Sequence, residues 1–500
     1  MSKSYNQTNQ TKKTKLLVNN YSKNLLNFYK PTLKLLEKDT RIAQMFSIKE
    51  NRTMRNFLTY IYTQFIEVNK FINTLNIANS RREISNVSTK ISTLIKDHLS
   101  KSIYIDSSII TYISNNLNNC KLISYENIIY NKKFVLDFII YDKININNLD
   151  SIVKNMLVFL QILIKISKNS NNKINECSKD GISITFFLTP FLKKLNIIET
   201  ESEVKETLGA KNVNSGFNYT CLNSGLIFIY RKEDFFKVFI HESVHGYGID
   251  RALHFDFSKN ENYNKFLNLF AFANKSTTNV GINEALTEFW TSLLYLCVNS
   301  YQDSKNLSSF IYNFERLYKL ELVHALYQIS KILHYNNLTY NSFTKNSNSN
   351  SNYKENSHIF SYFIVKTMML LNHEHMLNSQ LFDLNNISKL EYINIKLKSD
   401  AISVNKLFAN LYDYATYPYF IKIMNIIEAE HMKHYNNFIS SYGFAKIQKQ
   451  NNKPRNSNKI KNNTKKLKLP IRKVITYKSK TNDTLNMLTN LKMVIYDYTI

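Results

Sequence analysis

The stretch FKVFIHESVHGYGID, residues 236–250, decides how the fold of this 500-residue chain is interpreted. His241 and His245 are four residues apart, so on a helix they lie only about 40° apart on one face and both imidazoles can reach one ion. Glu242 lies about a quarter-turn away, suited to a water on that ion but not to the ion itself. Gly246 and Gly248 follow directly and predict the end of the helix.

Zinc chemistry explains why these residue types occur at this spacing. Neutral imidazoles bind zinc well, and a catalytic zinc site has three protein ligands with a water in the open position. The ion lowers the pKa of that water, and a carboxylate takes its proton as the water attacks a carbonyl. An apolar stripe predicts that the helix packs on a core, and it consists of Phe236, Ile240, Val244 and Tyr247. We therefore expect one Zn²⁺ ion on His241 and His245, with Glu242 as general base.

A third ligand is expected from the stretch VGINEALTEFWTSLLYL, residues 280–296. Glu284 and Glu288 are also four residues apart, on one face of a predicted helix. One carboxylate can bind the metal while the other accepts the N–H of a ligating histidine and fixes its tautomer. The alternative is a pair of solvated glutamates on an amphipathic helix, which becomes the weaker interpretation beside the HESVH stretch. The residues expected to pack inward are Leu286, Phe289, Trp290 and Leu293.

An HExxH motif followed by a helix that carries Asn-Glu-x-x-Thr-Glu resembles the gluzincin group of zinc metallopeptidases, of which thermolysin is a member. The resemblance implies a zincin-like core, a small mixed sheet with the HExxH helix beneath it. It also implies that His241, His245 and Glu284 bind zinc. Glu242 would be the general base, and Glu288 the outer partner of His241. The chain departs from thermolysin-like sequences in a longer gap between the motifs and in Glu, not Asp, at position 288.

The metzincin motif HExxHxxGxxH is matched only as far as Gly248. Arg251 stands where the third ligand should be, and a permanently charged guanidinium cannot bind a metal. Asp250 and His254 are out of register with that position. The sequence therefore favours the gluzincin interpretation.

Two further parts of a cleft can be sought in the sequence. Zincin peptidases, by resemblance, bind substrate as an extra strand along a sheet edge, and NVNSGFNYT (212–220) is the candidate edge. Asn214, Ser215 and Gly216 are its candidate substrate-binding residues, although an ordinary loop before a strand is equally consistent. A donor for a developing oxyanion is usually His or Tyr. The sequence does not identify it among many tyrosines and His324, His334, His373 and His375.

The composition is that of a folded globular protein, with 44% hydrophobic and 13% aromatic residues. The cysteines lie far apart without a CxxC pair, which predicts no disulfide framework and fits a reducing compartment; they are Cys120, Cys177, Cys221 and Cys297. The N-terminus lacks the apolar core of a secretory signal. The most apolar run, residues 151–167, carries two lysines and is too short to span a bilayer, so a buried helix is expected.

The formal net charge of +27 has two interpretations. It can indicate nucleic acid or another acidic partner. It can also follow from adenine- and thymine-rich codons, because the chain is equally crowded with Asn, Ile, Tyr and Phe. The tail at 446–480 is basic without interleaved aromatics, which favours phosphate attraction over base stacking, or a solvated segment without a partner. The composition and this tail also resemble proteins of large DNA viruses of protists.

The organisation predicted along the chain is α+β. A disordered polar N-terminus (1–20) precedes a helical region (21–100) and a zincin-like catalytic core (101–300), in which a hairpin at Asn131-Lys132 and strands at 181–189 and 224–231 are expected. A helical lobe (301–445) with a low-complexity loop (344–358) follows, then the basic tail and a C-terminal segment (481–500) that can form a strand and dock on the body.

The expected function is zinc-dependent hydrolysis of peptide bonds, in the host cytoplasm or a virion if the chain is viral. Three other functions stay open. The first is a catalytically silent structural or virion protein on the same fold. The second is a nucleic-acid-associated protein acting through the tail, and the third is hydrolysis of a non-peptide amide by the same chemistry.

Overall fold

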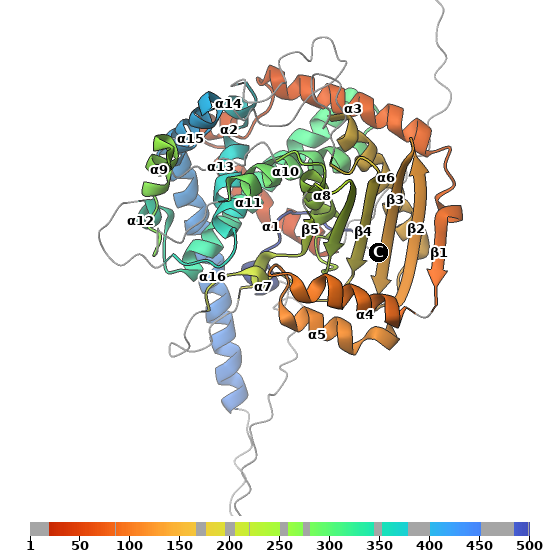
Figure 1. Cartoon of the computed structure of the whole chain (residues 1–500). Coiled ribbons are helices and arrows are strands. Elements are labelled where there is room, and N and C mark those ends of the chain that lie inside the picture. The colour runs from red at the N-terminus through yellow and green to blue at the C-terminus, as the bar shows by residue number, and fades with distance from the viewer. Residues whose placement is uncertain are drawn as a thin grey trace, which may run out of the picture.

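The computed structural model describes residues 20–85, 87–166, 177–195, 206–219, 221–250, 259–273, 281–344, 353–378, 401–451, 485–498 and 500. The predicted α+β class is confirmed, because helices surround one mixed six-stranded sheet (Figure 1). The predicted disordered N-terminus lies outside these residues up to position 19. So do most of the low-complexity loop (345–352) and most of the basic tail (452–480).

The sheet contains β1 (Arg81–Ile84), β2 (Lys121–Ile129), β3 (Lys132–Ile140), β4 (Gly181–Phe187), β5 (Gly216–Tyr219) and β6 (Ser224–Ile229). Its order is β1-β2-β3-β4-β6-β5. The central pairs β3–β4 and β4–β6 are parallel, whereas β1–β2, β2–β3 and β5–β6 are antiparallel. The parallel strands are nearly continuous in apolar residues because helices cover both their faces.

The helices before the metal-site stretch are α1 (Asn20–Leu36), α2 (Thr40–Met45), α3 (Arg52–Ile72), α4 (Ser88–Asp97), α5 (Ser107–Asn115), α6 (Ile146–Ile166) and the single turn α7 (Ala210–Val213). Those that follow are α8 (Phe235–Gly246), α9 (Glu261–Asn268), α10 (Ile282–Gln302), α11 (Leu307–Tyr335), α12 (Tyr340–Thr344), the π-helix η6 (Phe360–Val365), α13 (Lys366–Leu371), α14 (His373–Asn378), α15 (Ala401–Ala415) and α16 (Pro418–Asn451). Short 3₁₀ turns are η1 (Ile77–Ser80), η2 (Leu99–Lys101) and η3 (Leu117–Asn119). None of the described helices is long and apolar enough to cross a bilayer.

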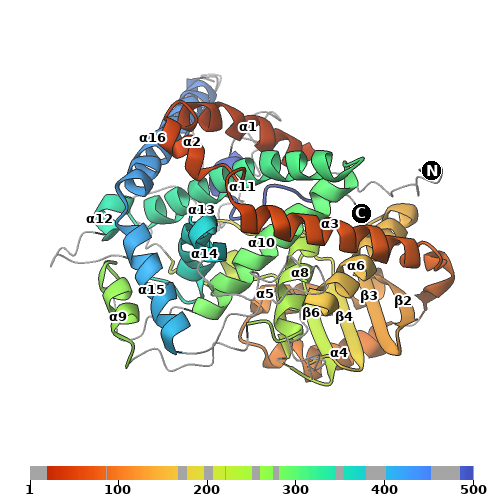
Figure 2. The ribbon, with the colours of Figure 1, turned by 90° about the horizontal axis from the view of Figure 1, so that it is seen from above.

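Two hydrophobic layers sandwich the sheet. On one face α4 and α5 pack through Ile91, Ile109 and Ile113. On the other face α6 and α8 join the main core, which continues into the helical lobe formed by α9 to α16 (Figures 1 and 2). Helix α10 lies against α8 and so connects the sheet to this lobe. The two expected metal-binding helices are therefore neighbours.

Two local predictions for the first 140 residues differ from the structure. The hairpin between β2 and β3 is confirmed, but its turn is Tyr130-Asn131, one residue earlier, and both adopt positive φ (51° and 61°). This geometry fits the right-handed twist of the strands. The region expected to be helical up to residue 100 also contains strand β1, whose charged residues hide the alternation that predicts a strand.

Cys177 and Cys221 form a disulfide, so the expectation of unpaired cysteines is wrong for these two. The parallel register of β4 and β6 explains the pairing, because Gly181 lies opposite Ser224 and the segments before both strands meet. A disulfide does not clearly fit the reducing compartment that was expected. Cys120 and Cys297 have free thiols.

The C-terminal segment docks on the body as predicted, but no regular strand is assigned to the described residues of 485–500. Residues 487–498 are all buried. Several backbone N–H and C=O groups of this segment form hydrogen bonds with side chains of other elements. In α11, His324 Nε2 lies 2.9 Å from the carbonyl of Lys492, Lys331 donates to the carbonyl of Asn490 (3.0 Å), and Glu321 accepts from the N–H of Ile495 (3.0 Å).

Glu321 gives this packing a pH dependence. Burial raises its pKa from 4.5 to about 7, despite an opposing effect of Lys366. Because the folded pKa exceeds the unfolded one, protonated Glu321 stabilises the fold fully below about pH 4.5, and this contribution is lost as the pH rises through about 7. We compare the free energy of unfolding of Glu321→Gln with that of the wild type. The difference should grow by about 3 kcal/mol in favour of the variant as the pH rises from 4.5 to 8.

Chemical denaturation at a series of pH values measures this difference. Exposed Glu50→Gln is the matched control, and its stability curve should run parallel to that of the wild type. If the Glu321→Gln curve is parallel as well, then Glu321 does not titrate in this range in the folded state.

Candidate metal centre

Helix α8 follows β6 after a short turn and is buried along its whole length. It ends at Gly246, where the sequence predicted. Gly248 adopts a left-handed conformation (φ 63°) and donates its N–H to the carbonyl of His245 (2.8 Å), which satisfies one of the last carbonyls of the helix. The glycine also reverses the chain after the last helical turn, which contains His245.

The structure brings the three expected ligands together. His241 Nε2 and His245 Nε2 are 3.0 Å apart, and each lies 3.4 Å from Glu284 Oε2 on α10. A tetrahedral zinc ion with bonds of about 2.0–2.1 Å holds neighbouring ligand atoms about 3.3 Å apart. The spacing of the three donor atoms thus fits one zinc ion. Among the described residues, this is the group of His, Cys, Asp and Glu side chains with a geometry for one ion.

The electrostatics of the cluster also fit a cation. Glu284 Oε2 is buried and makes no hydrogen bond with the described part of the chain beyond its ion pairs to the two imidazoles. Burial raises the pKa of Glu284, but His245 and His241 outweigh this effect, and the pKa lies well below its usual range. A carboxylate held ionised in a buried position requires a positive partner.

Each histidine has an outer carboxylate at its other nitrogen. His241 Nδ1 lies 2.7 Å from Glu288 Oε1, the residue that the sequence placed there. His245 Nδ1 lies 2.8 Å from Asp250 Oδ2. Both carboxylates are placed to fix the imidazoles with Nε2 toward the ion. The sequence interpretation missed Asp250, although the left-handed turn predicted by Gly248 was a signal that the following residues fold back onto the helix.

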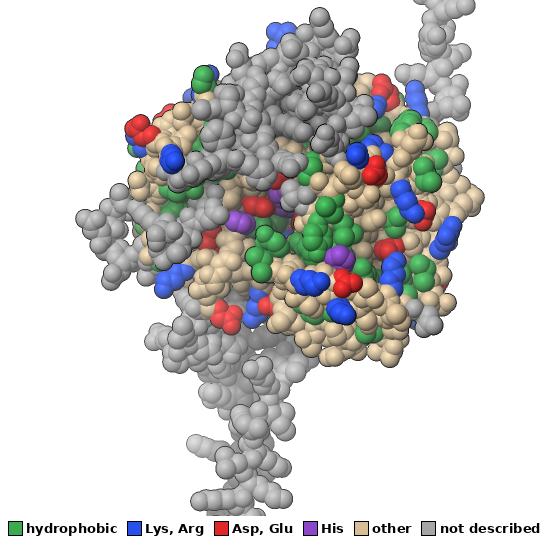
Figure 3. Space-filling model, viewed as in Figure 1, with side chains coloured by type: hydrophobic (Ala, Val, Ile, Leu, Met, Phe, Trp, Pro, Cys, Tyr) green, Lys and Arg blue, Asp and Glu red, His purple; other side chains and the backbone are tan. Residues whose placement is uncertain are grey.

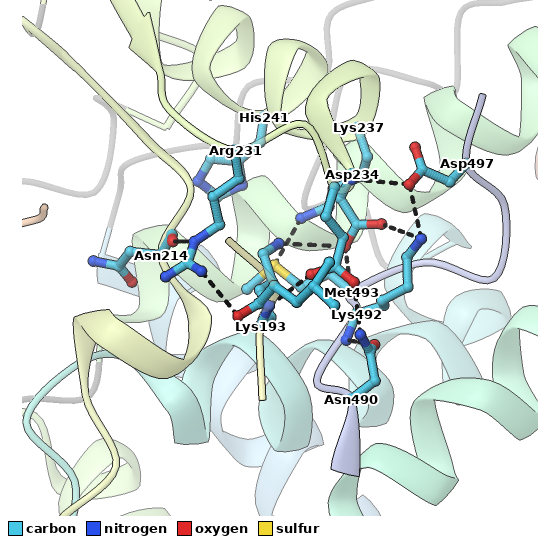
Figure 4. A network of polar contacts seen from close by, with 12 residues as sticks. Lys193, Asn214, Arg231, Asp234, Lys237, His241, Asn490, Lys492, Met493 and Asp497 are labelled. Atoms are coloured by element: carbon cyan, nitrogen blue, oxygen red, sulfur yellow. Dashed lines mark hydrogen bonds and ion pairs between the residues drawn. The ribbon is translucent and has the colours of Figure 1, made fainter. Parts of the chain in front are cut away.

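A buried ammonium supports the outer carboxylate. Lys237 lies one turn before His241 on α8, and its Nζ pairs with Glu288 Oε1, the same oxygen that contacts His241. Lys237 also contacts Met493 Sδ at 3.1 Å, which connects the metal centre to the C-terminal segment. The segment is itself held by Lys492, whose Nζ lies 2.9 Å from Asp497 and 3.2 Å from Asp234 (Figure 4). The position of Glu288 thus depends on residues far apart in the sequence.

The expected general base lies beside the cluster. Glu242 accepts a hydrogen bond from Asn218 Nδ2 of β5 (2.7 Å), and burial raises its pKa above the usual value. Gly216 in the same strand allows this approach, since a Cβ there would lie 2.8 Å from Val238 and 3.1 Å from Glu242 Oε1. The sequence interpretation did not assign Asn218 a role. The one available signal was that Asn218 is an amide two residues after Gly216 on the candidate edge strand.

The predicted edge at 212–220 contains β5, the last strand in the sheet order. Gly216 begins this strand, and Asn214 and Ser215 precede it. Ser215 uses its carbonyl inside the sheet, accepting from the N–H of Tyr230 (2.8 Å). All three residues line a cavity of about 30 Å³ together with His241 and Glu242.

A tyrosine from the helical lobe completes the wall of this cavity. Tyr362 of η6 lines it, and its ring centre lies 6.1 Å from that of His241. Burial, with the nearby carboxylates of Glu284 and Glu242, raises the pKa of Tyr362 well above its usual value, so the hydroxyl keeps its proton and can donate. The four histidines considered from the sequence lie in α11 and α14, and none lines this cavity.

Of the three expected ligands, Glu284 has the most exposed side chain, at 23%. In Figure 3 acidic and histidine side chains are visible in a hollow near the middle of the face, with hydrophobic side chains beside it. Comparison of the chain with protein-family models, with curated proteins and with solved structures finds no match. The geometry of the centre is therefore the basis for assigning a function.

Proposed function

We propose that this chain is a zinc-dependent metallopeptidase with a gluzincin-like centre. The observation that carries the proposal is the convergence of three donor atoms 3.0–3.4 Å apart, from His241, His245 and Glu284, beside the buried carboxylate of Glu242. The zincin-like description of the fold is part of the same proposal. A helix carrying two of the ligands runs beneath the edge of a mixed sheet, and a second helix supplies the third.

In the proposed reaction, different residues of the chain have different roles. When bound, zinc supplies a water of lowered pKa and polarises the substrate carbonyl. Glu242 takes a proton from the attacking water and returns it to the leaving amine, because a carboxylate can act as the base and its acid form as the proton donor. Asn218 holds the Glu242 carboxylate in place. The hydroxyl of Tyr362 donates a hydrogen bond to the carbonyl oxygen as negative charge develops there.

A peptide library tests the proposal directly. Purified protein should bind about one zinc ion per chain, cleave a subset of peptides, lose this activity in a chelator and regain it when zinc is restored. A parallel panel of small non-peptide amides distinguishes peptide hydrolysis from other amide hydrolysis. A protein that binds no zinc, or that cleaves equally well after complete metal removal, would disprove the proposed function.

A further inference from the structure

The outer side of β5 offers backbone groups to a further strand. The N–H of Tyr230 in the segment after β6 donates to the carbonyl of Ser215. The backbone N–H and C=O groups of every second residue from Ser215 therefore point toward β6. Antiparallel alternation therefore turns the N–H and C=O of Gly216 and Asn218 away from β6. No strand within the described ranges pairs with this side of β5. An extended peptide can add there by backbone hydrogen bonds.

The two edges of the sheet differ in chemistry. The outer strand β1 has the sequence RREI, with three consecutive charged residues, which is a common protection against pairing with another chain. The strand β5 has the sequence GFNY and carries no charge and no proline. An unprotected edge directly beside Glu242 is consistent with an edge that is used for binding.

Side chains of β5 alternate between two layers, and so would those of an added strand. Asn218 points to α8, where it contacts Glu242. Phe217 and Tyr219 point to the opposite layer, where Phe217 packs with α4 and α5 and the hydroxyl of Tyr219 lies 2.9 Å from His98 Nδ1. Every second side chain of a bound peptide would therefore face the layer of α4 and α5.

Exposed apolar side chains occur in β5, in the turn after it and in the segment that contacts its start. We call Ile103, Tyr104, Tyr219 and Leu222 the apolar shelf; their exposed fractions are 84%, 46%, 36% and 42%. The carbonyl of Tyr104 accepts from the hydroxyl of Tyr230 (2.6 Å) and from Asn214 Nδ2 (3.4 Å), which fixes the shelf at the start of β5. Leu222 lies in the turn after β5. Four of the twelve exposed large hydrophobic residues of the described chain thus lie in this strand, in the turn after it or in the segment that contacts its start.

Building on the proposed peptidase function, we propose that the substrates are extended peptide segments with large apolar side chains at alternate positions. The peptide backbone pairs with Gly216 and Asn218, and the alternate apolar side chains cover the shelf. Side chains between them face α8 and the metal centre. This occupant accounts for an unprotected edge, an apolar surface on one side of it and a catalytic carboxylate on the other.

Profiling of cleavage sites in a peptide library tests the preference. Large apolar residues should be enriched at two positions separated by one residue on the same side of the cleaved bond. Replacing both with Ser should lower kcat/KM on the order of tenfold or more, since each apolar side chain loses its burial. Cleavage of peptides without any apolar preference would overturn this inference and leave the proposed function intact.

Variants locate the preference on the protein. Ile103→Ser with Tyr104→Ser should lower kcat/KM for the apolar peptides by a larger factor than for the Ser-substituted peptides. Ile128→Ser with Tyr130→Ser is the matched control, since these side chains are similarly exposed (71% and 70%) on a distant hairpin. An equal loss in both double variants would overturn the assignment to the shelf.

Binding without turnover separates this inference from the peptidase function. Fluorescence anisotropy with the Glu242→Gln variant should show tighter binding of the apolar peptide than of its Ser-substituted form, and the shelf variant should abolish this difference. The oligomeric state is measured alongside. If wild type forms a dimer that the shelf variant dissociates, and the apolar peptide does not compete, a second copy of the chain occupies the edge and the proposal is wrong.

Discussion

The Glu242→Gln variant should bind zinc as the wild type does and hydrolyse peptides at least about 100-fold more slowly, because general-base catalysis contributes about 10²–10⁴. The substitution keeps the shape of the side chain and its acceptor for Asn218, which donates to Glu242 Oε2 at 2.7 Å. It removes the one function that an amide cannot perform, which is to accept a proton from the attacking water. Steady-state kinetics on the best library peptide, with metal analysis of the same samples, measures both effects.

A matched variant separates proton transfer from positioning. Asn218→Ala keeps the Glu242 carboxylate but removes the hydrogen bond that orients it, so we expect a smaller loss of kcat than in Glu242→Gln. Full activity of Glu242→Gln would exclude Glu242 as the base. If Glu242→Gln also lost its zinc, the loss of activity would not concern proton transfer, and the assigned role would have no support.

Residues within one helix were predictable from the sequence because helical spacing fixes their geometry. The spacing of His241 and His245 defines one face of α8, and Gly248 defines its end. The approach of Glu284 to them is a tertiary contact between α8 and α10. It was suggested by the chemical demand for a third ligand and by the resemblance of the motifs, not by helical spacing. The sequence pattern contains no information on the distance between Glu284 and the two histidines, because the packing of α8 against α10 determines it.

Contacts that depend on chain reversal or on distant segments could not be predicted in the same way. Asp250 reaches His245 only because the chain folds back after Gly248. Lysine side chains are mostly exposed in folded proteins, yet Lys237 is buried against Glu288 and Met493, which is 256 positions away in the sequence. Tyr362 was one of 33 tyrosines, and only the packing of η6 places it beside His241. Periodicity reports which face of an element is buried, not which element covers it.

Pairing of the two cysteines illustrates the same limit. Sequence separation suggested isolated thiols, because 44 residues divide Cys177 from Cys221. Because β4 and β6 pair in parallel, the segments before the two strands lie side by side, and the two cysteines are close in space despite their separation in the sequence. A parallel pair leaves no short turn in the sequence as a signal.

The Glu284→Ala variant should lose zinc at concentrations that saturate the wild type. Loss of an outer partner lowers metal affinity about 10–100-fold, and loss of a ligand should exceed this range. Glu284 lies in the first turn of α10 and its side chain is 23% exposed, so its removal should leave the helix folded, as circular dichroism can check. Competition with a chromophoric zinc chelator measures the affinity, and peptide hydrolysis should fall in parallel with zinc occupancy.

Two controls make the measurement specific to the proposed ligand set. Glu288→Gln should weaken zinc binding within the 10–100-fold range of an outer partner, whereas Glu261→Ala, which removes an exposed carboxylate paired with Lys265, should have no effect. Asp250→Asn tests the one other carboxylate in contact with His245. If Asp250→Asn lost zinc completely while Glu284→Ala retained it, Asp250 would be the third ligand. The catalytic geometry proposed around Glu284 would then be wrong.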